Sequence, residues 1–344
     1  MHRLTPLLGL FAAAFACAQG NPLPDLPDPH GRGGMAAVTV LDDEGQEAIL
    51  AAGGCNFPDG PPWDGGTKRY YRDILLLSRK GTVWTWKKIG ELPKPVAYAA
   101  FAPTPDRKSM VIAGGCDEKA HHEDVWRIGL NGEVDAKTAR LPGPRAFAGH
   151  AYDARRLVIV GGSDHPDATT SALEAIELDL RASTGRWKTR KELGTWGILP
   201  LTGLFSDGEL VGSGCVLMAR DGKPFRLYGS DLMCGTKDES WRTSLERPIV
   251  AAAGPGVRCG KYLLFVGGDD GSHYPRPPKD HPGLSRDILA VDRLKVRKVG
   301  TWPEPIVTAL LLRLDDRLVT VGGEDRPGHR TAKVSSWILP EEFR

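Results

Sequence analysis

An acidic and a basic side chain flank a predicted tight turn near the C-terminus. In the stretch LVTVGGEDRPGHRTAK, residues 318–333, Glu324 and Arg330 stand six residues apart on either side of Pro327-Gly328. A positioned carboxyl group can carry protons in acid/base catalysis, and a planar guanidinium is well shaped to hold a carboxylate. The same spacing also suits an ordinary exposed salt bridge. Both interpretations follow from the residues alone.

Two long segments rich in glycine and proline offer further polar and aromatic groups. They read CNFPDGPPWDGGTKRYY, residues 55–71, and DDGSHYPRPPKDHPGLSR, residues 269–286. Loops of this length are typical of binding surfaces, although each could also serve only packing. The side chains of the first segment that could line a sugar pocket are Asn56, Trp63, Asp64 and Lys68, with Trp63 able to stack on an apolar sugar face.

Three more candidates lie in or just after proline-containing turns. Arg145 belongs to LPGPRAF, Tyr98 belongs to LPKPVAY, and His150 begins the apolar strand that follows Arg145. We expect them to face the same surface as the long loops. Packing or support of a loop is the more ordinary role for each of them.

A metal site is not expected in this sequence. His121-His122 precedes Glu123-Asp124, but neighbouring residues on a strand point to opposite faces, so a solvated loop is the better interpretation. Apart from Cys17, the cysteines form no CxxC pair and no cysteine/histidine ligand spacing, and an odd count leaves at least one thiol unpaired; they are Cys55, Cys116, Cys215, Cys234 and Cys259. We expect no cofactor.

The apolar run that precedes Glu324 is one copy of an internal repeat. Runs that end in a glycine pair recur as AILAAGG, MVIAGG, LVIVGG, LLFVGG and LVTVGG, and ELVGSG is a degenerate copy. Successive copies are 47 to 61 residues apart, an interval that suits one four-stranded antiparallel unit. The acid and the base occur only in the last copy. A repeated scaffold therefore carries one loop with distinctive chemistry.

The segments between the glycine pairs predict short strands. A second strand follows each loop, a tryptophan-containing or basic strand usually comes next, and a proline turn then leads into the next apolar strand. Short apolar strands separated by glycine and proline, without a sustained 3.6-residue period of apolar residues, predict an all-β fold. The 22 residues after Gly322 and the 35 from Gln19 through Gly53 together make one more interval. We therefore expect a six-bladed β-propeller, closed by strands from both termini.

Composition and the first residues indicate an exported protein and make nucleic acid an unlikely partner. Charged residues make up 26% and the net charge is +2, so no broad surface for nucleic acid or anionic membrane is indicated. Residues 1–18 resemble a signal peptide, with a weakly basic start, a short apolar run and small residues before Gln19. Lipidation of Cys17 is the alternative. We expect a mature chain of residues 19–344, periplasmic or secreted, without a membrane span.

The repeat resembles the kelch family of β-propellers over essentially the whole mature chain. Within that family, GGEDRPGHRT is similar to the GE-x-x-PG-x-RT segment of bacterial N-acetylneuraminate epimerases, which interconvert the anomers of sialic acid. GGCNFPDGPPWDGGTKRYYRDI is similar to the opening of a circularly permuted, mutarotase-like branch. The resemblance implies an isomerase in which Glu324 is the acid/base and Arg330 belongs to the active site.

The implied reaction suits these residue types. Exchange of anomers removes a proton from the anomeric hydroxyl and delivers one to the ring oxygen, and one carboxyl group can do both. An arginine fork could hold the sialic acid carboxylate, with Asn56, Trp63, Tyr98 and Arg145 as further substrate-binding candidates. The alternative is a non-catalytic propeller that binds a glycan or a protein partner. A sialidase is not indicated, because no S-x-D-x-G-x-x-W segment occurs.

Overall fold

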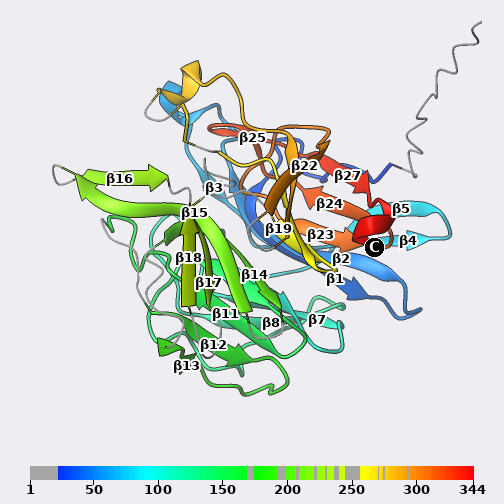
Figure 1. Cartoon of the computed structure of the whole chain (residues 1–344). Coiled ribbons are helices and arrows are strands. Elements are labelled where there is room, and N and C mark those ends of the chain that lie inside the picture. Colours follow the sequence, from blue (N-terminus) through cyan, green and yellow to red (C-terminus); the bar gives the residue numbers. More distant parts are fainter. Residues whose placement is uncertain are drawn as a thin grey trace, which may run out of the picture.

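The computed structural model describes residues 22–168, 174–191, 198–206, 209–220, 223–228, 231–235, 240–244, 256–269, 271–273, 276–292 and 295–344. The described chain is built from antiparallel strands and short 3-10 turns (Figure 1). No described helix is long and apolar enough to cross a bilayer. The proposed signal peptide at residues 1–18 lies outside these ranges.

Five sheets each contain a path of four antiparallel strands in chain order. The first sheet is β1 (Gly33–Leu41), β2 (Glu47–Asn56), β4 (Asp73–Lys80) and β5 (Val83–Glu91), with β3 (Arg69–Tyr70) paired to the end of β2. The second is β6 (Ala100–Pro103), β7 (Ser109–Ala113), β8 (Val125–Gly129) and β9 (Val134–Asp135). The third is β10 (Gly149–Tyr152), β11 (Arg156–Val160), β12 (Ile176–Asp179) and β13 (Lys188–Thr189).

The fourth sheet departs most from the repeat. It contains β14 (Ile198–Ser206), β15 (Glu209–Arg220), β17 (Asp231–Gly235) and β18 (Ser240–Ser244), and β16 (Lys223–Tyr228) pairs with the end of β15. The degenerate glycines Gly212 and Gly214 lie inside the 12-residue β15, so this strand continues where its counterparts end. The fifth sheet is regular, with β19 (Gly256–Cys259), β20 (Tyr262–Val266), β21 (Asp287–Asp292) and β22 (Lys295–Thr301).

The last part of the chain forms a three-stranded sheet and a separate hairpin. The sheet is β23 (Leu311–Leu314), β24 (Arg317–Val321) and β27 (Val334–Ile338), and the hairpin is β25 (Glu324–Arg326) with β26 (His329–Arg330). The described N-terminal residues contribute β1 to the first sheet rather than a strand to this one. They reach the last sheet through single hydrogen bonds, such as Leu26 N–H to the Ala332 carbonyl at 2.8 Å.

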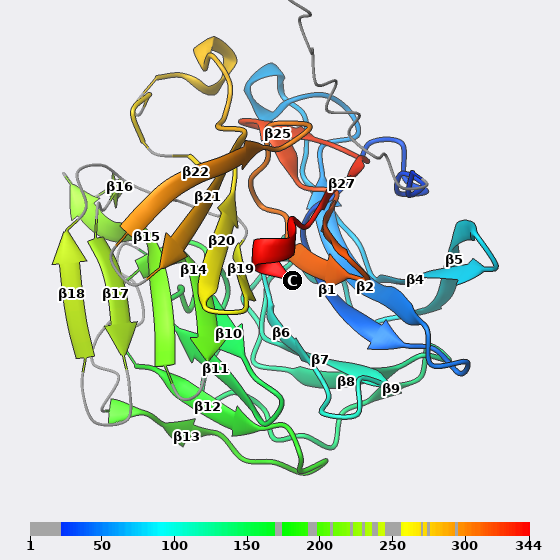
Figure 2. The same cartoon turned by 45° about the vertical axis from the view of Figure 1, so that its right-hand side comes forward.

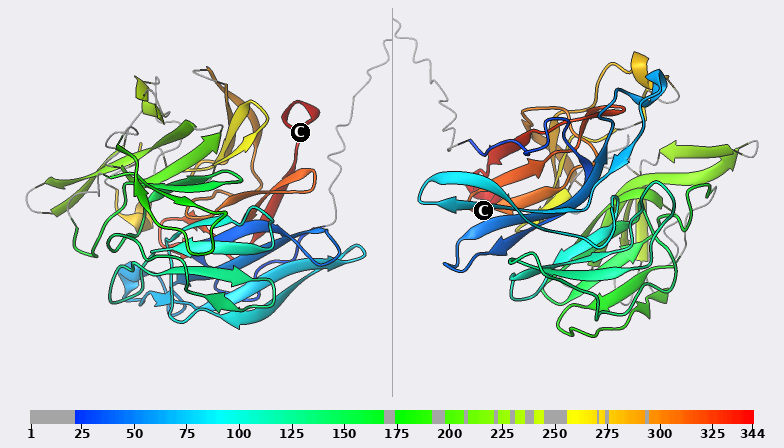
Figure 3. Two further views of the ribbon diagram at one scale, coloured as in Figure 1. Left: turned by 90° about the horizontal axis from the view of Figure 1, so that it is seen from below. Right: turned by 180° about the vertical axis from the view of Figure 1, so that it is seen from behind.

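The sheets follow one another around a common centre (Figure 2). The first strand of each sheet contacts the first strand of the next along the chain, and β23 contacts both β19 and β1. The apolar faces of neighbouring sheets pack together, as where Leu50 and Ile74 of the first sheet meet Phe101 and Ile112 of the second. Burial of these faces is the main stabilising term. The two views of Figure 3 show the stacked sheets from below and from behind. The molecule is an all-β propeller.

The glycine pairs lie where neighbouring sheets meet most closely. Gly53, Gly114, Gly267 and Gly322 all have positive φ, between 59° and 71°. A Cβ atom at Gly322 would lie 2.3 Å from the Arg32 carbonyl oxygen, and one at Gly53 would lie 2.2 Å from that of Val96. Any side chain would therefore clash with backbone. The repeated glycines are required by the contact between sheets.

The proline turns carry a second repeated feature. Tyr98, Phe147 and Thr308 occupy the same place in three turns, and each has left-handed φ, between 52° and 56°. Their backbones are linked through Gly34: its N–H donates to the Thr308 carbonyl and its carbonyl accepts from the Tyr98 N–H, both at 2.8 Å. Phe147 N–H then donates to the Tyr98 carbonyl at 3.1 Å. This chain of hydrogen bonds aligns one side chain per sheet at the same end of the molecule.

Candidate functional site

The hairpin β25–β26 brings Glu324 and Arg330 directly opposite one another. The two residues are cross-strand partners, and Pro327-Gly328 forms the turn between them. Gly328 has φ +74°, and its N–H donates to Glu324 Oε1 at 2.5 Å. Glu324 thus stabilises the turn that positions its own partner. Arg330 ends the separate strand β26, and β27, which pairs with β24, begins only at Val334.

Glu324 and Arg330 form a buried ion pair. Nη1 of Arg330 contacts Oε2 of Glu324, and only 5% and 13% of the respective side chains are exposed. Thr308 Oγ1 lies 3.5 Å from the same Glu324 oxygen. The interpretation as an exposed surface salt bridge is therefore wrong. A pair withdrawn from water interacts more strongly, and each charge depends more on its partner.

Tyr98 completes the surroundings of the guanidinium. Its hydroxyl accepts a hydrogen bond from Arg330 Nη2 at 2.8 Å, and its ring stacks on Phe147 at 4.3 Å between centroids. Burial raises the pKa of Tyr98 well above its ordinary value, and the nearby Arg330 charge only partly offsets this, so the phenol stays protonated. Burial by itself lowers the pKa of Arg330, but Tyr98 and Cys55 outweigh it and the net shift is upward.

Two glycines make room for these side chains. A Cβ atom on Gly33 would lie 2.9 Å from Cδ and Nε of Arg330, and one on Gly34 would lie 2.7 Å from the Tyr98 ring. Arg330 Nε is buried and has no hydrogen-bond partner in the described part of the chain. This nitrogen is shielded from solvent and lies against Gly33, so it does not face the cavity.

Trp63 lies over the turn of the hairpin. It belongs to the 3-10 turn η1 (Pro62–Asp64) of the first long loop and is 38% exposed. A Cβ atom on Gly328 would lie 2.5 Å from its ring, so the indole packs directly on the glycine. The first long loop and the last hairpin therefore form one surface.

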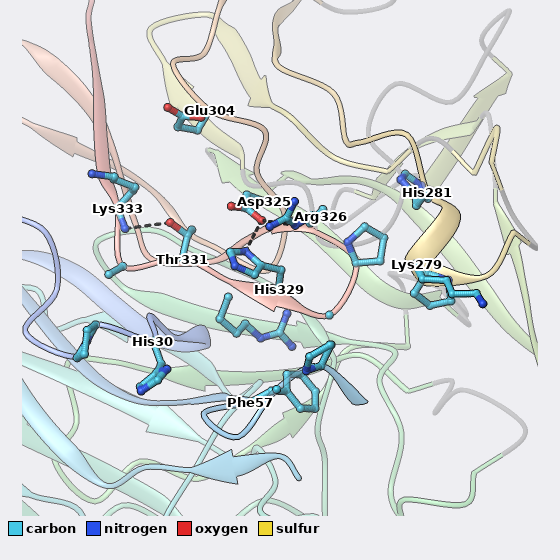
Figure 4. A pocket seen from close by; sticks show the side chains of 18 of the residues that line it. His30, Phe57, Lys279, His281, Glu304, Asp325, Arg326, His329, Thr331 and Lys333 are labelled. Carbon is cyan, nitrogen blue, oxygen red and sulfur yellow. Dashed lines mark hydrogen bonds and ion pairs between the residues drawn. The ribbon is translucent and has the colours of Figure 1, made fainter. Parts of the chain in front are cut away.

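A cavity of about 1100 Å³ opens beside the hairpin, and Arg330 is part of its wall. Four segments form most of its wall: residues 25–30, the first long loop, the hairpin with the residues after it, and the second long loop with its 3-10 turn η3 (Pro278–Asp280). Figure 4 shows Phe57 and His30 on one side of the hairpin residue His329, with Lys279 and His281 across the cavity. Its volume is in the range of a small-ligand site.

Asn56 and Arg145 lie apart from the ion pair. Asn56 is fully buried, donates to the Gly31 carbonyl at 2.8 Å and accepts from the Tyr71 hydroxyl at 2.9 Å. Arg145 donates through Nη1 to the backbone carbonyls of Gly161 at 3.0 Å and Glu174 at 3.2 Å. Neither side chain contacts Glu324 or Arg330 among the described interactions. Their polar groups hold backbone in place.

The paired histidines are buried, so the expectation of a solvated loop was wrong. His121 and His122 are only 8% and 6% exposed. His121 Nδ1 lies 3.1 Å from the Ser163 carbonyl oxygen, and His122 Nε2 lies 3.4 Å from an Asp117 oxygen. Within the described ranges, no three histidine, cysteine or acidic residues gather as metal ligands would. The histidines instead join two neighbouring loops.

The thiols that the structure describes are buried and unpaired. Cys55, Cys116 and Cys259 are free, and burial raises the pKa of Cys116 to about 12 and that of Cys259 to about 11. The side chains of Cys215 and Cys234 lie outside the described residues.

The sequence analysis missed three contacts of the ion pair, Thr308, Gly33 and Phe57, and also Gly34, which packs on Tyr98. Thr308 could have been predicted from the sequence. An alignment of the turns LPKPVAYA, LPGPRAFA and WPEPIVTA places it at the position of Tyr98 and Phe147. The pair Gly33-Gly34 does not fit the repeat, because no apolar strand precedes it. These glycines instead begin β1 and lie against Arg330 and Tyr98.

Comparisons with known proteins identify the architecture. No protein-family model matches the sequence, and no curated protein matches it. Among solved structures, the chain is similar to that of YjhT, with a TM-score of 0.66 and 13% sequence identity. The match covers 93% of this chain and 97% of that one. At this identity the likeness is one of fold alone, and this chain has the fold of a β-propeller.

Proposed function

We propose that this protein is a sugar mutarotase that interconverts the anomers of N-acetylneuraminate or a related sugar. The observation that carries the proposal is the buried pair of Glu324 and Arg330, whose arginine lies in the wall of a ligand-sized cavity. The resemblance of GGEDRPGHRT to the epimerase segment supports it, since the matching acid and base are the two groups that face each other.

In the proposed reaction, Glu324 takes the proton from the anomeric hydroxyl while the bond between the anomeric carbon and the ring oxygen breaks. The same carboxyl group, directly or through water, delivers this proton to the ring oxygen, which gives the open-chain ketone; closure on the other face, with the proton moved in the reverse direction, returns the opposite anomer. No atom is gained or lost. Arg330 orients the substrate through its carboxylate. When that carboxylate takes a share of the guanidinium, Glu324 loses part of its counter-charge and becomes a stronger base.

We also propose that the sheets form a closed ring of six blades, with β23–β24–β27 as the sixth. Two repeated contacts support this. Gly323 N–H donates to the Arg32 carbonyl at 2.7 Å, as Gly54 N–H donates to that of Val96 at 2.8 Å, and β23 contacts both β19 and β1. Closure would hold the hairpin against β1, where Gly33 makes room for Arg330.

We further propose that the protein works outside the cytoplasm, periplasmic or secreted, after removal of residues 1–18. The basic start, apolar run and small residues before Gln19 support this. Detection of a mature N-terminus at Gln19 in the secreted or periplasmic fraction would test the proposal.

A second candidate is a non-catalytic propeller that binds a glycan or protein partner at the same surface. The closed ion pair favours it, because Glu324 and Tyr98 already engage both terminal nitrogens of Arg330. An enzyme must open this pair to free the acid, whereas a binding module need not.

Anomer exchange followed by proton NMR separates the two candidates. The wild type should speed exchange of freshly dissolved N-acetylneuraminate, and Glu324→Gln should abolish this while binding stays within about tenfold. The matched control is Asp325→Asn, which changes an acid of the same hairpin that pairs with His329; it should exchange like wild type. Unchanged exchange in Glu324→Gln would reject the enzyme.

A further inference from the structure

In the described part of the chain, Lys68 is a cation without a counter-charge beside the ion pair. It precedes β3, whose register with β2 pairs Cys55 with Tyr70 and Asn56 with Arg69. One step further along these strands, Phe57 and Lys68 lie side by side, and Lys68 Nζ is 5.5 Å from the centre of the Phe57 ring. The backbone pairing thus fixes where the ammonium lies.

Three aromatic rings surround this ammonium. Besides Phe57, the rings of Tyr98 and Tyr70 have their centres 5.7 Å and 5.8 Å from Lys68 Nζ. Such contacts attract a cation but leave its capacity to donate hydrogen bonds unused. Lys68 is half-buried, and no carboxylate among the described residues pairs with it. Asp117, the acid of the neighbouring loop, instead accepts from the Lys119 and Ala120 N–H groups and lies near His122.

Two of these three aromatic residues, Phe57 and Tyr98, also contact Arg330. The Arg330 guanidinium carbon lies 5.5 Å from the centre of the Phe57 ring, and its Nη2 donates to the Tyr98 hydroxyl. Glu324 neutralises Arg330. The side chains of Lys68, Arg330 and Glu324 therefore carry a net charge of +1. This positive charge belongs to Lys68 and complements one negative charge on a ligand.

We propose that Lys68 is the residue that selects an anionic ligand, and that its ammonium binds the ligand's carboxylate. The inference rests on the proposed function and refines it, since it adds a second cation beside Arg330 to hold that carboxylate. Lys68 donates to one carboxylate oxygen as a compact point charge.

The test compares one ligand with and without its charge. Binding of N-acetylneuraminate and of its C1 methyl ester is measured by titration calorimetry on the wild type, Lys68→Met and Lys68→Arg. Methionine keeps the apolar stem over the rings and removes only the ammonium. The control is Lys261→Met, which removes a lysine outside the cavity that already pairs with Asp292 at 2.9 Å.

Lys68→Met should weaken N-acetylneuraminate binding about tenfold or more while changing ester binding by no more than about twofold. Lys68→Arg should restore most of the loss, and Lys261→Met should bind like wild type. Added salt should weaken binding less in Lys68→Met than in wild type. Equal losses for acid and ester, or no loss, would overturn the inference. If the wild type still exchanged anomers in that case, the proposed function would stand; a wild type that neither binds nor exchanges would overturn both.

Discussion

The hydroxyl of Tyr98 lies 2.8 Å from Nη2 of Arg330, although 232 residues separate them in the chain. The contact joins the turn before the second sheet to the hairpin of the last. Tyr98 has φ +56°, an unfavourable conformation for a residue with a side chain, and its ring fits only because Gly34 has none. A strained backbone conformation persists where the surrounding contacts hold it in place, and such residues often lie at functional sites.

The Tyr98–Arg330 hydrogen bond should stabilise the fold as well as the site. Tyr98→Phe leaves a buried guanidinium donor without its partner, so we expect a loss of about 1–3 kcal/mol in the free energy of unfolding, measured with urea. Tyr152→Phe is the control, because Tyr152 is also a buried tyrosine but its hydroxyl makes no hydrogen bond among the described interactions. Equal stability losses in the two variants would contradict the role of the bond.

Glu324 and Arg330 should be strongly coupled. Arg330→Met leaves a buried carboxylate without its cation, and we expect it to cost about 3–5 kcal/mol. Adding Glu324→Gln removes the uncompensated charge, so the double variant should be more stable than Arg330→Met alone. Urea unfolding of both single variants and the double variant completes the cycle. Additive effects would mean that the two groups do not depend on each other.

The packing of Trp63 on Gly328 can be separated from the conformational cost of the turn. Gly328→Ala should suffer both the positive φ and a clash with the indole, and destabilise the protein by about 2–4 kcal/mol. Gly45→Ala is a matched control, since Gly45 has φ +75° against +74° for Gly328 but no described atom within 4 Å of the position that a methyl group would take. It should cost only about 1 kcal/mol. A shift in tryptophan fluorescence should accompany Gly328→Ala alone.

His150 should make stability depend on pH. Its ring packs edge-on against Phe101 at 4.2 Å, and burial lowers its pKa from 6.5 to about 4. At a pH between these two pKa values, His150 binds a proton more readily in the unfolded chain than in the folded one. Stability is therefore full above pH 6.5 and falls as the pH drops to about 4, by at most about 3 kcal/mol.

The variant His150→Leu should flatten this part of the pH profile, measured by urea unfolding from about pH 7 to about pH 4. Phe101→Leu is the control: it removes the ring contact but keeps the histidine, so stability should fall at every pH while the slope remains. A profile of the same slope in His150→Leu and wild type would show that other groups produce it.

The sequence by itself determined the scaffold and the chemical types at the site. Glycine pairs at recurring intervals predicted the repeated four-stranded units. The structure places these glycines at the junctions between sheets, where a Cβ atom would meet a neighbouring backbone carbonyl. The unique spacing of Glu324 and Arg330 singled out the last loop. Such features can be predicted because they depend on local backbone geometry and on a repeated pattern.

The tertiary structure alone decided which residues surround the ion pair. Sequence could not show that the pair is buried, that Tyr98 binds it, or that Asn56 and Arg145 point into other contacts. Each depends on how turns from distant sheets meet around a common centre, and a small rotation of one sheet would change every neighbour. The balance of charges at the site, with Lys68 left over, likewise exists only once these chain segments lie together.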